Sequence, residues 1–288
     1  MNTKERADRI SGRTGLVALL GHPVAHSLSP RMHNVAFAAR DLDMAYLAFD
    51  VQSEHLGEAV SGLLALGARG ANVTVPYKEA VMPFTGRLDP LAEQVGAVNT
   101  LVWEEGRFTG YNTDVYGFLM SLEHAWGRAP AGARCLVLGA GGAARAVVAG
   151  LLRGGAEQVW VYNRTRSRAE ELCQAAEGWG QSPCQAIGTE ELRTSATAAD
   201  LIVNATSAGL QDPIKEPAVF VDRIGKKHMV MELLYGKRTT DFLRAAQLRG
   251  AVTSDGAEML VQQAAVSFEL WTGIPAPVEL MRQQVKRA

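Results

Sequence analysis

Residues 134–145 read Arg-Cys-Leu-Val-Leu-Gly-Ala-Gly-Gly-Ala-Ala-Arg, and this stretch decides the fold. The apolar run predicts a strand buried on both faces, and the alanine-rich residues up to Leu152 predict a helix. The glycines therefore lie in a strand-to-helix turn, the context that a dinucleotide-binding turn requires. Gly139 permits the tight turn, Gly141 leaves the backbone open to a pyrophosphate, and Ala144 lets the helix pack closely on the strand.

The next predicted strand, residues 158–162, ends in a basic segment, residues 163–168, at the distance from the glycines where a ribose-binding residue is expected. An NAD site places an acidic residue there, and this segment has none. The alternative interpretation is that these basic residues are only solvated side chains at the start of the predicted helix 167–176. It is disfavoured because cations at that end of a helix oppose the helix dipole. The sequence therefore predicts NADP as the cofactor. The planar cations and short donors that suit its 2′-phosphate are Arg164, Arg168, Asn163 and Thr165.

Composition restricts the class of protein. The chain has 288 residues, of which 47% are hydrophobic and 20% charged, a size that predicts about two globular domains. Its net charge of -1 gives no electrostatic basis for binding nucleic acid or an acidic membrane surface. No apolar run reaches the length of a membrane span, and the first fourteen residues lack the apolar segment of a signal peptide.

The cysteines and histidines carry no metal-binding pattern. Cys135, Cys173 and Cys184 form no Cys-x-x-Cys pair, and we expect reduced, buried thiols in a cytoplasmic protein. His22, His26 and His33 do not share one helix face at metal-ligand spacing, so we interpret them as loop or packing residues.

The order of predicted elements indicates an α/β protein. After the break at residues 127–132, strands alternate with helices, which predicts a parallel, doubly wound sheet. A strand at residues 16–20, a strand at 45–49 and a helix at 53–66 precede the break. We therefore place a domain boundary between about Asp114 and Gly132.

Two serines lie beside a predicted helix start. Ser29 is expected to be its N-cap, followed by Pro30 at the first helical position. Ser27 lies next to the same free N–H groups, which favour a bound carboxylate.

Further polar residues follow a predicted strand end. Asn72 and Thr74 share one face by alternation, and Pro76 begins a turn or short helix that presents Lys78. Lys78 alone could be a solvated surface charge, and Asp114 alone could be an N-cap of the next helix.

Two glutamines, Gln262 and Gln263, lie inside the mostly apolar helix predicted at residues 257–271. We expect at least one of them to contact ligand; the alternative is a core amide satisfied by the backbone.

The motifs together resemble the shikimate dehydrogenase family, over nearly the whole chain and in the family's order. The resemblance implies two α/β domains, the second of Rossmann type, with the active site in the cleft between them. It also implies an NADP-dependent oxidoreductase that interconverts 3-dehydroshikimate and shikimate in aromatic amino-acid biosynthesis. The matching motifs are His26-Ser27-Leu28-Ser29-Pro30, Ala71–Lys78, Gly96–Thr100, Asn112-Thr113-Asp114, Gly139–Ala143, Asn163–Thr165 with Arg168, Asn204–Ser207, and Met259–Val261 with Gln263.

The resemblance also implies domains and residue roles. Residues 1–114, completed by the C-terminal helices in 256–288, would bind substrate, and residues 115–255 would bind NADP. Lys78 and Asp114 would form the catalytic pair. The residues implied to bind substrate are Ser27, Ser29, Asn72, Thr74, Asn99, Tyr235 and Gln263. Those implied to bind the cofactor are Gly139, Ala140, Gly141, Gly142, Ala143, Asn163, Arg164, Thr165, Arg168, Leu233 and Gly256.

Two positions depart from the family's usual pattern. Tyr111 stands where an acidic residue often precedes Asn-Thr-Asp, and Glu258 stands where a second glycine is common.

Two other functions share the expected scaffold. A quinate/shikimate dehydrogenase that uses NAD should carry an acid at Arg164, and a non-catalytic NADP-binding module would need no pair of Lys78 and Asp114. The expected partner is a small-molecule substrate, and the expected state is a monomer or a homodimer.

Overall fold

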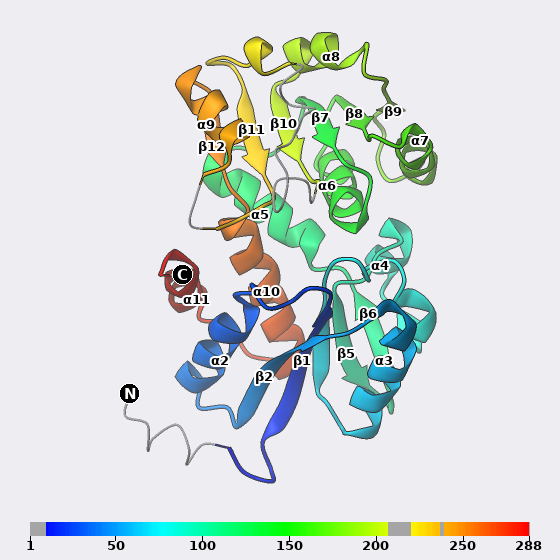
Figure 1. Cartoon of the computed structure of the whole chain (residues 1–288), viewed down its shortest axis with the longest axis vertical. Coiled ribbons are helices and arrows are strands. Elements are labelled where there is room, and N and C mark those ends of the chain that lie inside the picture. The colour runs from blue at the N-terminus through cyan, green and yellow to red at the C-terminus, as the bar shows by residue number, and fades with distance from the viewer. Residues whose placement is uncertain (1–9, 207–219, 237–238, 288) are drawn as a thin grey trace. The chain divides into compact units, whose positions relative to one another are not determined.

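The structure is a computed structural model that describes residues 10–206, 220–236 and 239–287 (Figure 1). Ser207, the last residue of one predicted motif, lies outside them. The chain divides into two compact units: unit 1 comprises Met1–Thr113 and Gln263–Ala288, and unit 2 comprises Asp114–Gln262. The second boundary falls inside α10 (Ala257–Thr272), because the first residues of that helix pack with unit 2.

Unit 2 contains the predicted parallel, doubly wound sheet, which is confirmed. Its six strands follow the order β12-β11-β10-β7-β8-β9, and every pairing is parallel. Strand order reverses between β7 and β10, the point where open α/β sheets bind ligands. The strands are β7 (Arg134–Leu138), β8 (Gln158–Tyr162), β9 (Cys184–Ala186), β10 (Leu201–Asn204), β11 (Met229–Glu232) and β12 (Val252–Ser254).

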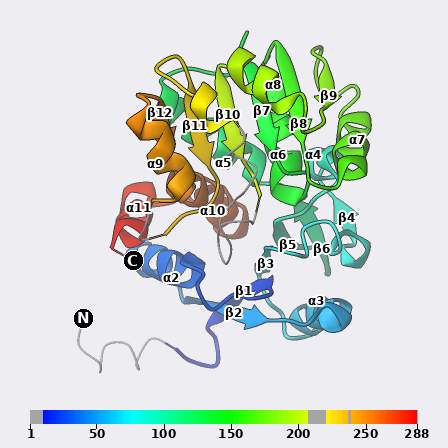
Figure 2. The same cartoon turned by 45° about the horizontal axis from the view of Figure 1, so that its top comes forward.

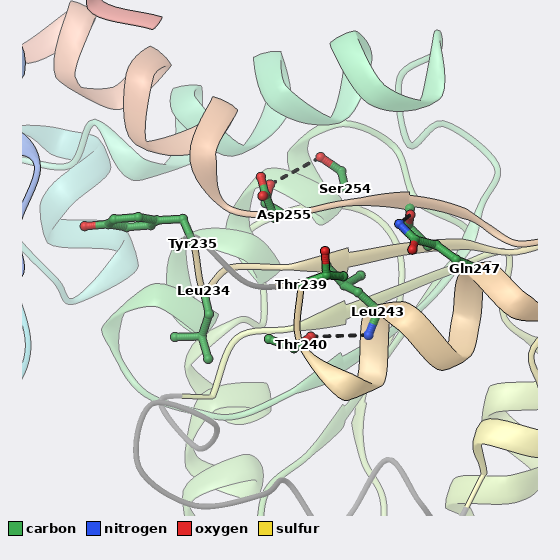
Figure 3. Close-up of a pocket in the computed structure, with 10 residues that line it drawn as sticks. Leu234, Tyr235, Thr239, Thr240, Leu243, Gln247, Ser254 and Asp255 are labelled. Carbon is green, nitrogen blue, oxygen red and sulfur yellow. Dashed lines mark hydrogen bonds between the residues drawn. The ribbon is translucent and has the colours of Figure 1, made fainter. Parts of the chain in front are cut away.

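Helices of unit 2 bury an apolar face against this sheet. A Cβ at Gly150 would lie 2.9 Å from Phe118, which shows how closely α6 and α5 pack. Helix α9 lies against β11 and β12 (Figure 2), and the Thr240 hydroxyl caps it by accepting the Leu243 N–H at 3.2 Å (Figure 3). The helices are α5 (Asp114–Trp126), α6 (Gly142–Arg153), α7 (Arg166–Ala175), α8 (Leu192–Ala198), the 3-10 turn η4 (Val221–Arg223) and α9 (Asp241–Leu248).

Unit 1 has a mixed sheet of order β2-β1-β3-β5-β6-β4. Strands β1, β2 and β3 run parallel, whereas β5 pairs antiparallel with both β3 and β6. The end of β3, the start of β5 and the end of β6 consequently lie at one edge of the sheet. The strands are β1 (Gly15–Gly21), β2 (Met44–Asp50), β3 (Gly70–Val73), β4 (Arg87–Leu88), β5 (Thr100–Glu104) and β6 (Arg107–Tyr111).

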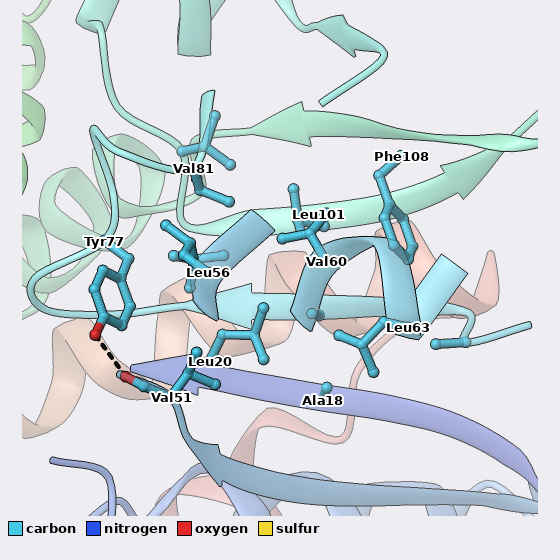
Figure 4. Packing of buried hydrophobic residues seen from close by; sticks show 14 of the residues in the cluster. Ala18, Leu20, Val51, Leu56, Val60, Leu63, Tyr77, Val81, Leu101 and Phe108 are labelled. Atoms are coloured by element: carbon cyan, nitrogen blue, oxygen red, sulfur yellow. Dashed lines mark hydrogen bonds between the residues drawn. The ribbon is translucent and has the colours of Figure 1, made fainter. Parts of the chain in front are cut away.

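The core of unit 1 follows strand alternation. Ala18 and Leu20 of β1 pack on Val60 and Leu63 of α3 (Figure 4). The predicted helix 53–66 is a 3-10 turn continued by α3. Helix α11 lies beside α2 (Figure 1). The helices are α2 (Ser29–Ala39), η1 (Ser53–His55), α3 (Leu56–Ala65), η2 (Met82–Phe84), α4 (Pro90–Val95), the second part of α10, and α11 (Val278–Lys286).

His33 confirms its interpretation as a packing residue. Its ring is fully buried and stacks on Tyr46 with centroids 4.6 Å apart. Burial lowers the pKa of His33 to about 3, so the ring is neutral. Among the described residues, no helix combines the length and the apolar character needed to span a membrane.

The three cysteines are unpaired in the structure, and one of them is not buried as predicted. Cys135 and Cys173 are buried, whereas Cys184 is partly exposed because it begins the edge strand β9.

Candidate active site

The glycine turn of unit 2 fits a pyrophosphate. Gly139 has φ +110°, and a Cβ there would lie 3.0 Å from the Ala205 carbonyl oxygen, so the position requires glycine. A Cβ at Gly141, in contrast, would meet no atom of the described residues within 4 Å, so they leave space in front of the turn. Gly141 is the N-cap of α6 and has no side chain to satisfy the first N–H groups, so these are available to phosphate oxygens. Gly139, Ala140, Gly141, Gly142 and Ala143 all belong to this turn and first helical residues.

The basic segment after β8 offers two cations to a phosphate. Arg164 and Arg168 are exposed, and within the described ranges neither forms an ion pair. Arg166 between them pairs with Glu170 at 2.9 Å. The Asn163 amide donates to the Thr165 carbonyl at 2.8 Å, which fixes the turn into α7. The two arginines lie where the helix dipole disfavours cations, an arrangement that an anionic ligand would relieve.

Leu233 and Gly256 lie in direct contact at the ends of β11 and β12. A Cβ at Gly256 would lie 2.0 Å from the Leu233 carbonyl oxygen, so no side chain fits there. Tyr235 follows and is partly buried, which raises the pKa of its phenol. It lines a cavity of about 400 Å³ together with Ser254 and Asp255 (Figure 3). Three of the sequence-predicted residues are thus gathered within unit 2.

The helix start at Ser27 and Ser29 differs from the prediction. Leu28 is the N-cap of α2 and Ser29 is already helical, so the expected Ser29 cap is wrong. The Ser27 hydroxyl instead accepts the Ser29 N–H at 3.2 Å. The physical reason is that Leu28 adopts helical φ and ψ, which moves the helix start back by one residue. The Ser27 hydroxyl then accepts a backbone N–H of the first turn that has no partner within the helix.

Thr74 lies beside the loop that carries these serines. A Cβ at Gly21 would lie 2.3 Å from Thr74 Cγ2 and 2.9 Å from Val24, and the His22 N–H donates to the Val75 carbonyl at 3.0 Å. Strand β3 ends at Val73, so Thr74 is the first residue beyond it.

Asn72 and Asn99 belong to a buried hydrogen-bond network of unit 1. The Asn72 amide donates to the Asn99 carbonyl and to Thr100 Oγ1, both at 3.1 Å, and its oxygen accepts the Tyr46 hydroxyl at 2.8 Å. The Asn99 amide donates to Thr113 Oγ1 at 2.9 Å, and its oxygen accepts the Thr113 N–H at 2.7 Å. The protein itself thus uses much of the hydrogen-bonding capacity of both amides.

Gln263 enters the same network from α10. Its Oε1 accepts from the Asn99 amide at 3.2 Å, and its backbone carbonyl accepts the Ser267 hydroxyl at 3.0 Å. Sequence reasoning missed Ser267, whose hydroxyl lies 2.8 Å from Thr100 Oγ1. The spacing of four residues on one helix face could have indicated it.

Lys78 belongs to a turn of unit 1, and Asp114 begins a helix of unit 2. Lys78 lies partly buried in a turn after β3, where its carbonyl accepts the Val98 N–H at 2.7 Å. The preceding Tyr77 is buried, and its hydroxyl donates to the Val51 carbonyl (Figure 4). Asp114 is buried and opens α5. Of the two predicted forms for this part of the chain, the turn at Lys78 is therefore confirmed rather than a short helix.

Glu232 is a buried acid that sequence reasoning did not identify. Its carboxylate accepts the Asn204 amide at 2.7 Å and the Thr240 hydroxyl at 3.1 Å. Asn204 in turn accepts the Thr206 hydroxyl at 2.8 Å, and Thr206 packs against Gly139. Glu232 therefore helps to position the strand end that faces the glycine turn. Burial raises its pKa to about 7, although both hydrogen bonds lower it.

The two unusual positions have local partners. The Tyr111 hydroxyl donates to Glu104 at 2.8 Å, and burial and this carboxylate raise the pKa of Tyr111 to about 12. Glu258 lies in the first turn of α10, where it accepts the Gln262 amide at 2.6 Å. An acid in that turn also favours the helix dipole.

The sheet order of unit 2, the open glycine turn and the basic start of α7 define an α/β dinucleotide-binding protein of the kind that takes NADP. Family models match three parts of the chain: the shikimate dehydrogenase substrate binding domain at residues 19–101, shikimate / quinate 5-dehydrogenase at 124–230, and the shikimate 5'-dehydrogenase C-terminal domain at 256–286.

Individual proteins match over nearly the full length. A curated shikimate dehydrogenase (NADP(+)) from Moorella thermoacetica is 48% identical over 97% of this chain and 95% of its own. The structure of shikimate 5-dehydrogenase from Thermus thermophilus in complex with NADP(H) and shikimate is 38% identical, with a TM-score of 0.83 over 95% of this chain and 99% of that one. Quinate dehydrogenase from Corynebacterium glutamicum in complex with NAD is 31% identical, with a TM-score of 0.87 over 96% and 99%. The chain belongs to the shikimate dehydrogenase family.

The buried Glu232 predicts a pH dependence of stability. Its folded-state pKa of about 7 lies above the ordinary value of 4.5. As the pH rises, the unfolded state therefore loses the Glu232 proton at a lower pH than the folded state does. The stabilisation from Glu232 is complete below pH 4.5 and is lost as the pH rises through 7. At about 1.4 kcal/mol per pKa unit it amounts to roughly 3 kcal/mol at most.

Denaturant unfolding between pH 4.5 and 8 measures this effect. The decline between pH 4.5 and 7 should be smaller in Glu232→Gln than in the parent chain. Glu190→Gln, which changes an exposed acid, should keep the parent profile. A Glu232→Gln profile parallel to that of the parent would show that Glu232 does not titrate in this range.

Proposed function

We propose that the chain catalyses the reversible NADPH-linked reduction of 3-dehydroshikimate to shikimate, in aromatic amino-acid biosynthesis. The observation that carries the proposal is the gathering of hydroxyl and amide side chains at one edge of the sheet of unit 1, in a member of this family. Such groups suit a polyhydroxylated acid because they bind hydroxyls without a competing charge. Oxidation of NADPH on addition of 3-dehydroshikimate, followed by absorbance, tests the proposal directly.

Lys78 and Asp114 are the proposed catalytic pair. Bound NADPH supplies a hydride equivalent, and the protein must supply the proton that the ketone oxygen takes up. Lys78 Nζ donates that proton and stabilises the negative charge that develops on the oxygen. Asp114, a buried carboxylate, keeps the ammonium oriented and charged.

The remaining residues divide between binding and positioning. Ser27 and Ser29 hold the substrate carboxylate near the first N–H groups of α2, with Tyr235 beside it. Thr74, Asn99 and Gln263 bind the hydroxyls. Asn72, whose amide already has internal partners, fixes β3 against α10 through a 3.1 Å bond to Ser267.

The cofactor residues follow the structure of unit 2. The turn Gly139–Ala143 holds the pyrophosphate, and Leu233 and Gly256 line the nicotinamide. The 2′-phosphate is held by Asn163, Arg164, Thr165 and Arg168. Arg164 in place of an acid favours NADP, and therefore shikimate dehydrogenase rather than an NAD-linked quinate enzyme. A cytoplasmic location stays a prediction from the cysteine pattern of the sequence, and so does a monomeric or homodimeric state.

Arg164→Ala should narrow the preference for NADP over NAD. A charge-assisted hydrogen bond to the 2′-phosphate contributes about 1.5–3 kcal/mol, so NADP affinity should fall roughly ten- to a hundredfold while NAD affinity stays nearly constant. Fluorescence titration with both cofactors measures this. Arg166→Ala is the matched control, because Arg166 already pairs with Glu170. If Arg164→Ala weakened the binding of NAD and NADP equally, Arg164 would not be the residue that binds the 2′-phosphate.

Ser27→Ala and Ser29→Ala should mainly raise KM, because the carboxylate they bind does not change in the transition state. Ser27→Ala should also lower the melting temperature slightly, since its hydroxyl accepts the Ser29 N–H. Ser29 is not the N-cap, so Ser29→Ala removes no cap bond and is the cleaner test of binding. Steady-state kinetics with parallel thermal melts separates the effect on binding from the effect on stability. An unchanged KM in both variants would exclude the two serines from the substrate site.

Lys78→Met should lower kcat roughly 10²–10⁴-fold and leave NADPH affinity nearly unchanged, because methionine keeps the stem and removes only the proton donor. Lys226→Met, which changes an exposed lysine, is the control and should be silent. Asp114→Asn should show a related loss. The double variant should lose much less than the product of the two, because the residues act as a unit. Near-normal turnover in Lys78→Met would contradict the mechanism but leave the fold and cofactor assignments intact.

A further inference from the structure

Two cysteines that the proposed reaction does not use lie together in unit 2. Cys173 is in the second half of α7 and Cys184 is the first residue of β9. Their sulfur atoms are 2.9 Å apart. A disulfide bond is about 2.05 Å long, so the two sulfur atoms are not bonded, and less than about 1 Å of movement separates them from a covalent bond.

Packing on both sides holds the two thiols in place. Trp179 in the connecting segment is buried, and its backbone N–H donates to the Ala176 carbonyl at 3.0 Å. The Pro183 carbonyl, next to Cys184, accepts the Val159 N–H at 3.1 Å. The proximity of the sulfur atoms is therefore set by the folded chain and not by a loose loop.

Cys184 differs in accessibility from the other two cysteines. Cys135 is fully buried in β7, and its pKa is raised by burial and by Asp200. Cys184 is partly exposed, so a small reagent can reach it, whereas Cys173 is buried. The hydrogen bond to Cys173, and then burial, raise the pKa of Cys184, which favours the thiol form at rest.

We propose that Cys173 and Cys184 form a reversible modification site at which a low-molecular-weight disulfide oxidises the folded chain to an intramolecular disulfide. Cys184 first loses its thiol proton to solvent. The thiolate then attacks one sulfur of the reagent disulfide, breaks its S–S bond and gives a mixed disulfide; the released reagent thiolate takes up a proton. The Cys173 thiolate then attacks the Cys184 sulfur, forms the internal bond and releases the second reagent thiol. The chain loses two protons and two electrons, and the reagent disulfide takes them up to become two thiols. The product ties the second half of α7 to the first residue of the edge strand β9.

Mass spectrometry of the folded full chain after incubation with oxidised glutathione tests this proposal. The parent chain should lose the mass of two hydrogens, its free thiols should fall from three to one, and a reducing agent should reverse both changes. Peptide mapping should find the bond between Cys173 and Cys184.

Single variants identify the attacking and the resolving thiol. Cys173→Ser should keep one glutathione on Cys184, because the resolving thiol is missing. Cys184→Ser should stay unmodified over the same time, because the remaining thiols are buried. The proposal would be overturned if the parent chain kept three free thiols under conditions that oxidise dithiothreitol, or if it kept a stable glutathione adduct. A disulfide bond to Cys135, or one between two chains, would also overturn it.

Discussion

The buried amide of Asn99 is the constraint on which unit 1 depends. It bonds to Thr113 at the end of the first part of the unit and to Gln263 at the start of the second. An unpaired amide at this depth would cost about 1–3 kcal/mol, so these parts of the chain are fixed together by necessity. The neighbouring Val98 N–H holds the carbonyl of Lys78. The turn that presents the proposed proton donor and the segment that leads into α5 are thus both positioned by this one stretch of chain.

Long periodic elements could be predicted from the sequence. The apolar run of β7 and the alanine-rich α6 needed no tertiary information, and the alternation after residue 132 implied the parallel sheet. Strands β9 and β12 were missed because each has three residues, too few for alternation to appear. The Ser29 cap was wrong because residue preference identifies a helix start only to within about a residue.

The candidate site shows the same limit at the level of side chains. Residue type and position predicted that Asn72 and Thr74 lie at a strand end in unit 1. The sequence could not show that Asn72 bonds to Ser267, or that Glu232 is buried against Asn204, because those partners come from elements that only tertiary pairing brings together. Pairing of Cys173 with Cys184 depends likewise on how α7 packs against β9.

The return of the C-terminus to unit 1 sets an order of events during synthesis. Phe268 stacks on Phe37 with centroids 5.5 Å apart, and the Trp271 indole donates to the Leu101 carbonyl at 2.9 Å. The ribosome makes these aromatic residues only after all of unit 2, whose own residues are continuous. The N-terminal part of unit 1 is therefore synthesised before the residues that cover its sheet, and one face of that sheet stays uncovered while unit 2 is made. Unit 2, although it comes second in the sequence, is thus the first unit that can fold completely.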